Sequence, residues 1–259
     1  MESYYAKQLE CLCSQVRPGD REAMEASKRH WNKIAKPLDG LGRMEDLLVK
    51  IAGVVRSEKL CLERKAVVVF CADNGVVAEG VTQTGSEVTA VVTENIARGI
   101  ASVNRMASVA GADVIPIDVG VKGRLQETGI RNCRIADGTA NLLHEPAMTM
   151  EQTLEAIHTG IALAGELKDS GYDLLAVGEM GIGNTTTSSA IASVMLEQPP
   201  EAVTGRGAGL SGEGLERKIQ VIQKAIVLHG PDREKPLEVL SALGLSLIHI
   251  SEPTRLGMI

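Results

Sequence analysis

Aromatic side chains are scarce in this 259-residue sequence, where phenylalanine, tyrosine and tryptophan together make up 2% of the residues. Single-stranded nucleic acids are usually held by stacking on such rings, so the scarcity argues against this kind of binding. Positive charge is also short, because 27 lysines and arginines face 33 aspartates and glutamates, a formal net charge of −6. A protein that neutralises a phosphate backbone needs the opposite balance. General nucleic-acid binding is therefore excluded, although a local phosphate pocket is not.

Long apolar runs and paired cysteines are missing as well. No stretch approaches the roughly 20 apolar residues that span a bilayer, and residues 1–10 are polar rather than signal-like. The cysteines show no CxxC spacing and no nearby histidine that would complete a zinc set. They are Cys11, Cys13, Cys61, Cys71 and Cys133. These absences predict a cytoplasmic protein with unpaired thiols, no membrane contact and no metal site.

Short apolar stretches rich in β-branched residues alternate with longer segments of helical period. The expected strands are residues 66–71, 113–119, 173–177 and 202–204. The expected helices are residues 44–59, 86–110 with a break near Gly99, 150–170, 190–196 and 215–228. Strand then helix, repeated, predicts an α/β fold, a parallel sheet flanked by helices in a Rossmann-like arrangement, with ligands bound where strands end.

The chain divides into regions of different character. Residues 1–59 contain no convincing strand and predict a smaller helical lobe, whereas residues 60–244 form the α/β core. Within that core, residues 120–149 lack periodicity and predict a long surface excursion, a kind of segment that is often functional.

One glycine-rich loop follows the expected strand at residues 173–177. Gly181 and Gly183 let the main chain approach a ligand closely, and Asn184 with Thr185 can cap the next helix, whose free amides form an anion site. Taken alone, such a turn is often only a tight connection. Glu179 favours function, because a carboxylate at the end of a central strand costs stability unless it is solvated, paired or used.

A second loop of this kind, residues 203–214, precedes the helix expected at residues 215–228. Ser211 is a plausible helix cap, and Lys218 brings positive charge to an acidic protein. The loop lacks both the dinucleotide-binding and the P-loop fingerprints, so two such loops are interpreted as gripping one phosphate. Its candidate binding residues are Gly205, Arg206, Gly207, Ala208 and Gly209.

A third loop, residues 71–86, follows the first expected strand. Asp73 is either a turn residue or a binding residue, and Glu79 either a surface charge or a functional one. Gln83 and Ser86, with the neighbouring threonines, supply neutral donors and acceptors suited to the edge of an uncharged ring.

In this order, the loops resemble the nicotinate-nucleotide:dimethylbenzimidazole phosphoribosyltransferases, which prepare the lower ligand of cobalamin. The most specific motif is Glu-Met-Gly-Ile-Gly-Asn-Thr-Thr at residues 179–186. The other motifs lie at residues 36–45, 72–81, 138–141, 146–149 and 205–209, and the resemblance runs from about residue 38 to residue 244.

The resemblance implies transfer of the 5-phosphoribosyl group of nicotinate mononucleotide to 5,6-dimethylbenzimidazole, without a cofactor or metal, by a homodimer. Glu179 would stabilise the developing charge or hold the azole. Residues 73–86 would line the base pocket, and Lys218 would help backbone amides to hold the 5′-phosphate. The implied substrate-binding residues are Asp73, Gln83, Ser86, Gly181, Ile182, Gly183, Asn184, Thr185, Gly205, Arg206, Gly207, Ala208, Gly209 and Lys218.

The resemblance stops after Gly244. The family's general base is a glutamate in a Gly-Glu-Gly-Thr-Gly-like loop that this sequence lacks, and residues 245–259 resemble the translation of a transposase-type sequencing adapter. We therefore expect a non-native tail on a truncated chain with weak or no activity, since loss of a general base costs on the order of 10² to 10⁴ in rate. A non-catalytic nucleotide- or phosphate-binding module is the alternative, and adenine, another benzimidazole or a phenol are alternative acceptors.

Overall fold

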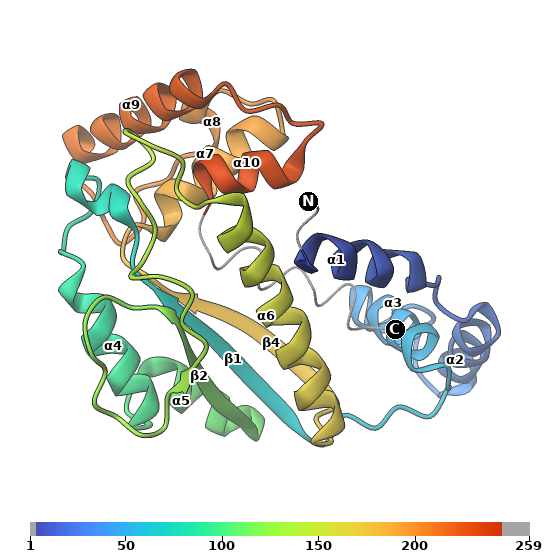
Figure 1. Cartoon of the computed structure of the whole chain (residues 1–259). Coiled ribbons are helices and arrows are strands. Elements are labelled where there is room, and N and C mark those ends of the chain that lie inside the picture. Colours follow the sequence, from blue (N-terminus) through green and yellow to red (C-terminus); the bar gives the residue numbers. More distant parts are fainter. Residues whose placement is uncertain (1–3, 245–259) are drawn as a thin grey trace.

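A parallel sheet forms the centre of the protein (Figure 1). The computed structural model describes residues 4–244. Its strands are β1 Lys65–Ala72, β2 Ala112–Gly120, β3 Arg131–Asn132 and β4 Leu174–Met180. Within this part of the chain the strand order is β3-β2-β1-β4, and each neighbouring pair runs parallel. The expected α/β fold is confirmed, as are the strands expected at residues 66–71, 113–119 and 173–177.

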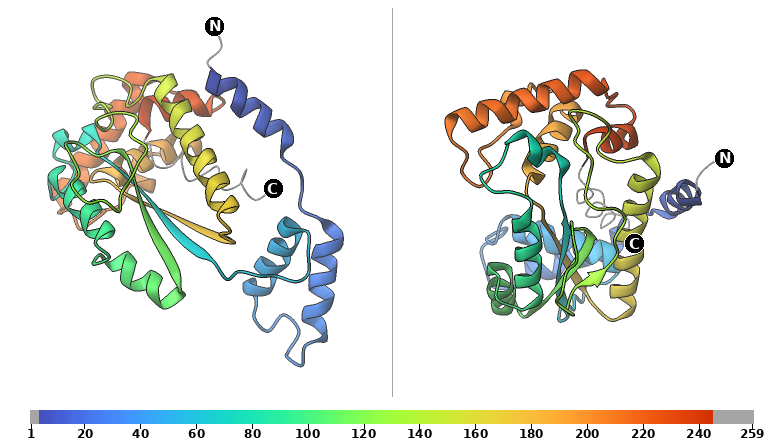
Figure 2. Two further views of the ribbon diagram at one scale, coloured as in Figure 1. Left: turned by 60° about the horizontal axis from the view of Figure 1, so that its bottom comes forward. Right: turned by 60° about the vertical axis from the view of Figure 1, so that its left-hand side comes forward.

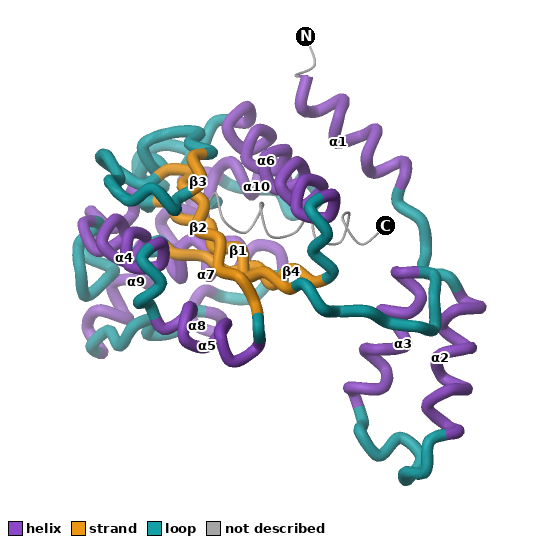
Figure 3. The backbone as a smooth tube through the Cα atoms, turned by 90° about the horizontal axis from the view of Figure 1, so that it is seen from below, coloured by secondary structure: helices purple, strands orange, loops and turns teal. Residues whose placement is uncertain are grey.

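Helices cover both faces of the sheet (Figure 3). They are α4 Glu87–Ala97 and α5 Ser102–Ala110 on one face and α6 Met150–Asp169 on the other. The side chains of β1 contact both helical layers, because successive side chains of a strand point to opposite faces of the sheet. Val68 and Phe70 belong to a buried cluster with Leu163 of α6, whereas Val69 belongs to another cluster with Ile96 of α4.

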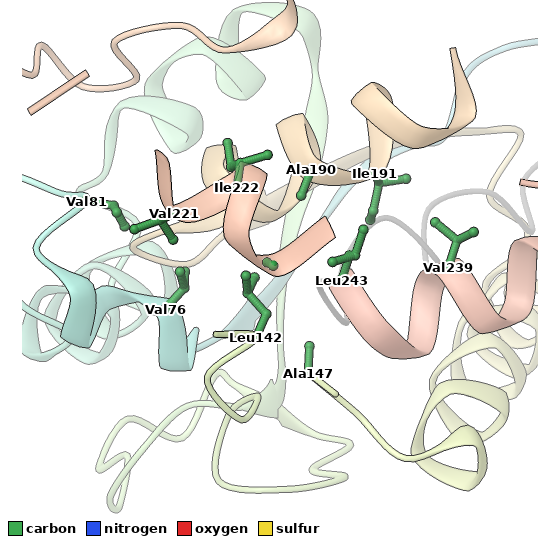
Figure 4. Close-up of a cluster of buried hydrophobic side chains, with 11 residues drawn as sticks. Val76, Val81, Leu142, Ala147, Ala190, Ile191, Val221, Ile222, Val239 and Leu243 are labelled. Carbon is green, nitrogen blue, oxygen red and sulfur yellow. The ribbon is translucent and has the colours of Figure 1, made fainter. Parts of the chain in front are cut away.

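A second group of helices packs beyond the carboxyl ends of β1 and β4. It consists of the 3-10 helix η1 Gly75–Glu79 and of α7 Asn184–Met195, α8 Pro200–Val203, α9 Gly212–His229 and α10 Pro236–Leu243. Figure 4 shows the buried cluster that they share, in which Val76 of η1, Ala190 of α7, Ile222 of α9 and Leu243 of α10 take part. Ser211 caps α9 as expected, since its hydroxyl accepts the amide of Gly214 at 3.1 Å. This group frames the loops that follow the strands.

The N-terminal region is helical, in agreement with the sequence. It contains α1 Tyr4–Gln15, α2 Arg21–Lys33 and α3 Arg43–Val55. The α2–α3 pair lies to one side of the sheet, as the left view of Figure 2 and Figure 3 show. Inside this pair, Lys36 Nζ lies 2.7 Å from the Glu45 carboxylate, and Glu45 also accepts the Leu41 amide at 3.0 Å. The Lys-Pro-Leu-Asp-Gly-Leu-Gly-Arg-Met-Glu motif at residues 36–45 thus closes a loop on itself through an ion pair.

Two sequence expectations about the strands are wrong. Residues 202–204 do not form a strand, because Pro200 occupies the first turn of α8, where its fixed φ favours a helix. The loop at residues 205–209 therefore follows a short helix. In addition, β4 is not central: within residues 4–244 it pairs only with β1 and lies at the edge of the sheet.

The remaining expectations concern the break near Gly99, the excursion at residues 120–149, the C-terminal tail and membrane spans. The break near Gly99 is confirmed, since α4 and α5 flank it and its φ is +75°. The excursion at residues 120–149 is tied to the sheet by β3, which pairs with β2. The proposed tail, residues 245–259, lies outside the described residues. No helix within residues 4–244 is long and apolar enough to cross a membrane.

Candidate functional site

Three loops and the helices α7 and α9 line a pocket of about 110 Å³ beyond the end of β4. The first loop follows η1, the second joins β4 to α7, and the third precedes α9, from which Lys218 projects. The lining residues are Val81, Thr82, Gln83, Thr84, Ile182, Gly183, Asn184, Thr185, Arg206, Gly207, Ala208, Leu210 and Lys218. Residues far apart in the sequence thus meet as expected.

Lys218 supplies the pocket's buried positive charge. Its side chain is 1% exposed, and its Nζ donates to Thr185 Oγ1 at 2.8 Å and to the Gly205 carbonyl at 3.1 Å. Burial lowers the pKa of this ammonium group. No carboxylate within residues 4–244 forms an ion pair with it. A buried cation that lacks a counter-ion favours the binding of an anion.

The turn between β4 and α7 adds partial positive charge. Gly183, with φ +93°, precedes the first residue of α7, Asn184. The Asn184 side chain accepts the Thr185 amide at 2.6 Å, so the expected capping residue is itself the first residue of the helix and Gly183 is the cap. The Asn184 and Thr186 amides also have acceptors, the carbonyls of Gly181 and Gly183, so this helix end attracts anions through the helix dipole. Two independent sources of positive potential therefore meet in one pocket.

The close approach of the third loop requires a glycine. Gly207 has φ +56°, and a Cβ at this position would lie 3.0 Å from Thr185 Oγ1 and 3.7 Å from Lys218 Nζ. A larger residue would force the loop away from the lysine and would also strain the backbone. The sequence expectation that these glycines permit close approach is consistent with the geometry at this residue.

Glu179 lies next to the pocket rather than in its lining. Its carboxylate accepts a hydrogen bond from the Asn184 side-chain amide, and Asn184 does line the pocket. The Glu179 side chain is solvent-exposed, yet the surrounding protein removes enough water to raise the pKa of its carboxyl group above the usual value. The carboxylate is thus paired with a neutral donor and has access to solvent.

Several predicted site residues hold the loops together. Gln83 donates its side-chain amide to the Gly209 carbonyl, and Arg206 donates to the Leu210 carbonyl at 2.9 Å. The Gly205 carbonyl accepts from Lys218. In this unliganded arrangement, Gln83 joins the first loop to the third instead of presenting its amide to the cavity.

Asp73 and Ser86 are not brought to the pocket lining. Asp73 is buried at the end of β1, where its carboxylate accepts the Lys122 amide at 2.7 Å. Burial raises the pKa of this carboxyl group. Its backbone bonds to Gly120 and Thr139, so it fastens the residues that follow β2. Ser86 precedes α4 as its N-cap residue but makes no side-chain capping bond.

Sequence reasoning missed other residues. Val81 and Leu210 line the pocket, and no pattern distinguishes them from ordinary core residues. Asn74 and Thr89 contact the β4–α7 turn, and their polar character in a buried setting becomes visible only in three dimensions. Within residues 4–244, no group of three or more histidine, cysteine, aspartate or glutamate side chains is arranged to hold a metal ion.

The α/β fold matches that of a solved phosphoribosyltransferase. The family model described as phosphoribosyltransferase matches residues 16–248, which is most of the chain. The chain belongs to this family.

Similar proteins carry the name of one particular enzyme. A nicotinate-nucleotide–dimethylbenzimidazole phosphoribosyltransferase from Acetivibrio thermocellus is 43% identical over 224 residues, which are 86% of this chain and 64% of the relative. One from Clostridium acetobutylicum is 39% identical over 236 residues, which are 91% of this chain and 67% of the relative. The resemblance found in the loop motifs is confirmed.

A solved structure agrees with these relatives. The crystal structure of CobT from Thermus thermophilus matches with a TM-score of 0.83 and 39% identity, over 88% of this chain and 69% of that chain. The chain spans only about two thirds of the length of the proteins that it matches, 64% for the relative from Acetivibrio thermocellus.

Proposed function

We propose that the protein transfers the 5-phosphoribosyl group of nicotinate mononucleotide to 5,6-dimethylbenzimidazole, giving α-ribazole 5′-phosphate and nicotinate in cobalamin nucleotide-loop assembly. The observation that carries the proposal is the buried ammonium group of Lys218 at the meeting point of two glycine-containing loops, where it forms no ion pair within residues 4–244. A phosphate monoester carries about −1.5 to −2 charges at neutral pH, which suits this site. The relatives' name supplies the identity of the two substrates.

The reaction depends on the protein mainly for positioning the two substrates, because nicotinate is a good leaving group. A ring nitrogen of the azole donates its lone pair to C1′ of the ribose, and the bond from C1′ to the nicotinate nitrogen breaks. The electron pair of that bond returns to the pyridinium ring, which becomes neutral, and the N–H proton of the benzimidazole is released. Attack from the opposite face inverts β to α. Positioning and stabilisation of the charge at C1′ are therefore the main demands.

We assign these demands to residues around the pocket. Lys218, Thr185 and the amides of Gly183 and of residues 206–208 would bind the 5′-phosphate. Glu179 would face C1′ or the azole, supported by its bond to Asn184. The side chains of residues 82–84 would line the base pocket. Asp73 and Ser86 would act by supporting the loops rather than by touching a substrate.

We also propose a cellular compartment, a division into domains and an oligomeric state. Cys11, Cys13 and Cys61 are exposed and unpaired, which supports a reducing compartment and hence the cytoplasm. The expected division into a helical lobe at residues 1–59 and a core at residues 60–244 is supported by the separate α2–α3 pair (Figure 2). A homodimer is proposed from the family resemblance alone.

Calorimetric titration with nicotinate mononucleotide tests the phosphate site. Nicotinate riboside, which lacks only the phosphate, is the matched control ligand. We expect the nucleotide to bind at least about tenfold more tightly, because a charge-assisted contact contributes about 1.5 to 3 kcal/mol. Equal affinities for the two ligands would contradict the assignment.

Product formation tests the reaction. The protein is incubated with nicotinate mononucleotide and 5,6-dimethylbenzimidazole, and α-ribazole 5′-phosphate is sought by mass spectrometry, with the Acetivibrio thermocellus relative as a control. Formation of this product supports the transferase. Binding of the nucleotide without any product, in a chimera that also carries the remaining C-terminal third of the Acetivibrio thermocellus relative, supports a nucleotide- or phosphate-binding module instead. Adenine, a second benzimidazole and a phenol in the same assay test the choice of acceptor.

A further inference from the structure

The peptide groups on both sides of Ile182 are held by buried polar side chains. The side-chain amide of Asn74, which follows β1, donates to the Ile182 carbonyl at 2.9 Å. The Ile182 amide in turn donates to Thr89 Oγ1 on α4 at 3.2 Å. The segment after β1 and helix α4 thus each form a hydrogen bond with Ile182, one with its carbonyl and one with its amide. Ile182 itself lines the candidate pocket.

Both hydrogen bonds to Ile182 come from side chains inside the protein rather than on its surface. Asn74 and Thr89 are both 0% exposed. Their hydrogen bonds to Ile182 are therefore shielded from competing water, which makes each bond stronger and its loss more costly.

Asn74 is not explained by stability alone. Its side-chain oxygen is buried and has no hydrogen-bond partner within residues 4–244. An apolar side chain of similar volume would avoid the cost of burying that oxygen. The residue's one side-chain bond within these residues goes to Ile182, and this bond is what an apolar residue could not make.

The neighbouring glycine fits the same arrangement. A Cβ on Gly181 would lie 2.3 Å from the Ala72 carbonyl oxygen and 3.0 Å from Asn74 Nδ2. The turn therefore lies directly against the end of β1, within reach of Asn74. Because the turn cannot move closer and is held from two sides, the direction of the following peptide groups is restricted.

We propose that Asn74 and Thr89 are positioning residues, which fix the peptide groups around Ile182 so that the next amide, that of Gly183, points at the substrate phosphate. Asn74 binds the Ile182 carbonyl, and the Gly183 N–H lies in the same peptide plane on the opposite side. This inference rests on the proposed function, since the phosphate is the group that this amide would meet. Neither residue contacts the substrate; both act through Ile182. Pre-organised donors need no rearrangement when the ligand binds, which is why their orientation affects affinity.

The hydrogen bonds that Ile182 makes to Asn74 and Thr89 are called the clamp below. Thr89→Val tests the clamp, because valine keeps the shape of threonine but cannot accept a hydrogen bond from the Ile182 amide. Thr89→Ser restores an acceptor. Thr93→Val is the matched control, since Thr93 is equally buried one turn along α4 and its hydroxyl bonds to the Thr89 carbonyl rather than to Ile182. Asn74→Leu removes the other contact and serves as a second variant should Thr89→Val fail to fold.

Two readouts separate the clamp from the proposed function. Residue-resolved amide hydrogen exchange reports the Ile182 bond directly, and titration with nicotinate mononucleotide reports phosphate binding. We expect Thr89→Val and Asn74→Leu to bind the nucleotide about tenfold more weakly, as loss of one buried hydrogen bond implies. Exchange at Ile182 should accelerate in Thr89→Val. Thr89→Ser and Thr93→Val should resemble the unmodified protein in both respects.

Unchanged nucleotide affinity in the folded Thr89→Val and Asn74→Leu variants would overturn the inference, as would unchanged exchange at Ile182 in Thr89→Val. If the unmodified protein does not bind the nucleotide while exchange at Ile182 still depends on Thr89, the clamp exists but the proposed function fails. The two failures are thus distinguishable.

Discussion

Lys218 Nζ lies 2.8 Å from Thr185 Oγ1, so α9 and the first turn of α7 meet through a buried ammonium group. Thr185 and the Gly205 carbonyl are both neutral acceptors, so they solvate the charge without cancelling it. The pocket consequently retains a net attraction for anions in the absence of a ligand.

Lys218→Met tests that attraction. Methionine keeps most of the apolar length of lysine but removes its charge, so nucleotide affinity should fall about tenfold to a hundredfold, as expected for a charge-assisted contact. Stability should stay equal or rise, because a charge is no longer buried. Titration calorimetry and urea unfolding measure the two effects. Lys224→Met, on the exposed side of α9, is the control and should change neither.

The same residue sets a pH dependence. Burial lowers the pKa of Lys218 below its ordinary value of 10.5. Between the folded-state pKa and 10.5, the unfolded chain binds more protons than the folded one, so this residue makes stability rise with pH in that window. Lys218→Met should remove this rise in pH-dependent urea unfolding. Nucleotide affinity in the unmodified protein should fall as the pH rises through the folded-state pKa, and a pH-independent affinity in that range would contradict this role.

Gly207→Ala should weaken both the fold and the site. Its φ of +56° is unfavourable for alanine, which costs about 1 to 3 kcal/mol, and the new Cβ would lie 3.0 Å from Thr185 Oγ1. We expect lower stability in urea unfolding and weaker binding of the nucleotide. Gly212→Ala is the matched control, because no atom lies within 4 Å of the added Cβ at this first residue of α9. Its stability should be equal or slightly greater.

Glu179→Gln separates binding from turnover. Glutamine can still accept the Asn184 hydrogen bond but carries no negative charge for C1′. In a chimera that also carries the remaining C-terminal third of the Acetivibrio thermocellus relative, turnover should therefore fall more than nucleotide affinity does, which kinetics and calorimetry measure separately. An equal loss in both would count against the assigned role. Because the pKa of Glu179 is raised, the folded state holds more protons just above pH 4.5, and Glu179→Gln should remove the resulting fall in stability with rising pH.

The Lys36–Glu45 pair should control acid stability of the N-terminal helices. The Lys36 ammonium, followed by the Leu41 amide, lowers the pKa of Glu45 below 4.5. The stabilisation is complete above pH 4.5 and is lost as the pH falls towards the folded-state pKa. Lys36→Met should lower stability at neutral pH and reduce the loss on acidification, as followed by thermal unfolding. Arg29→Met, which removes the exposed pair with Glu25, should have little effect on either.

The sequence predicted the sheet well because strand signals are local. Residues 66–71 are apolar and β-branched, and the helices on either side show clear period. The strand predicted at residues 202–204 is absent, because Pro200 favours a helical turn there. The sequence pattern also placed β4 at the centre, since strand order depends on contacts between distant segments that no local pattern records.

The candidate pocket was predictable where backbone chemistry is distinctive. Glycines and a nearby lysine mark residues 181–185, 205–209 and Lys218 in the sequence. The residues alone leave Asp73 as either a turn residue or a binding residue, and the family resemblance implies binding; in the structure its carboxylate accepts the Lys122 amide. Thr89 was missed, because a threonine in a helix looks the same whether or not its hydroxyl meets a distant amide.

The bond between Gln83 and the Gly209 carbonyl joins residues 126 positions apart. A ribosome that adds about 5 to 20 residues per second needs about 6 to 25 s to cover that distance. During that interval the first loop has no third loop to meet, and the cavity has only part of its wall. Recognition of the phosphate therefore cannot begin before Lys218 has emerged from the ribosome.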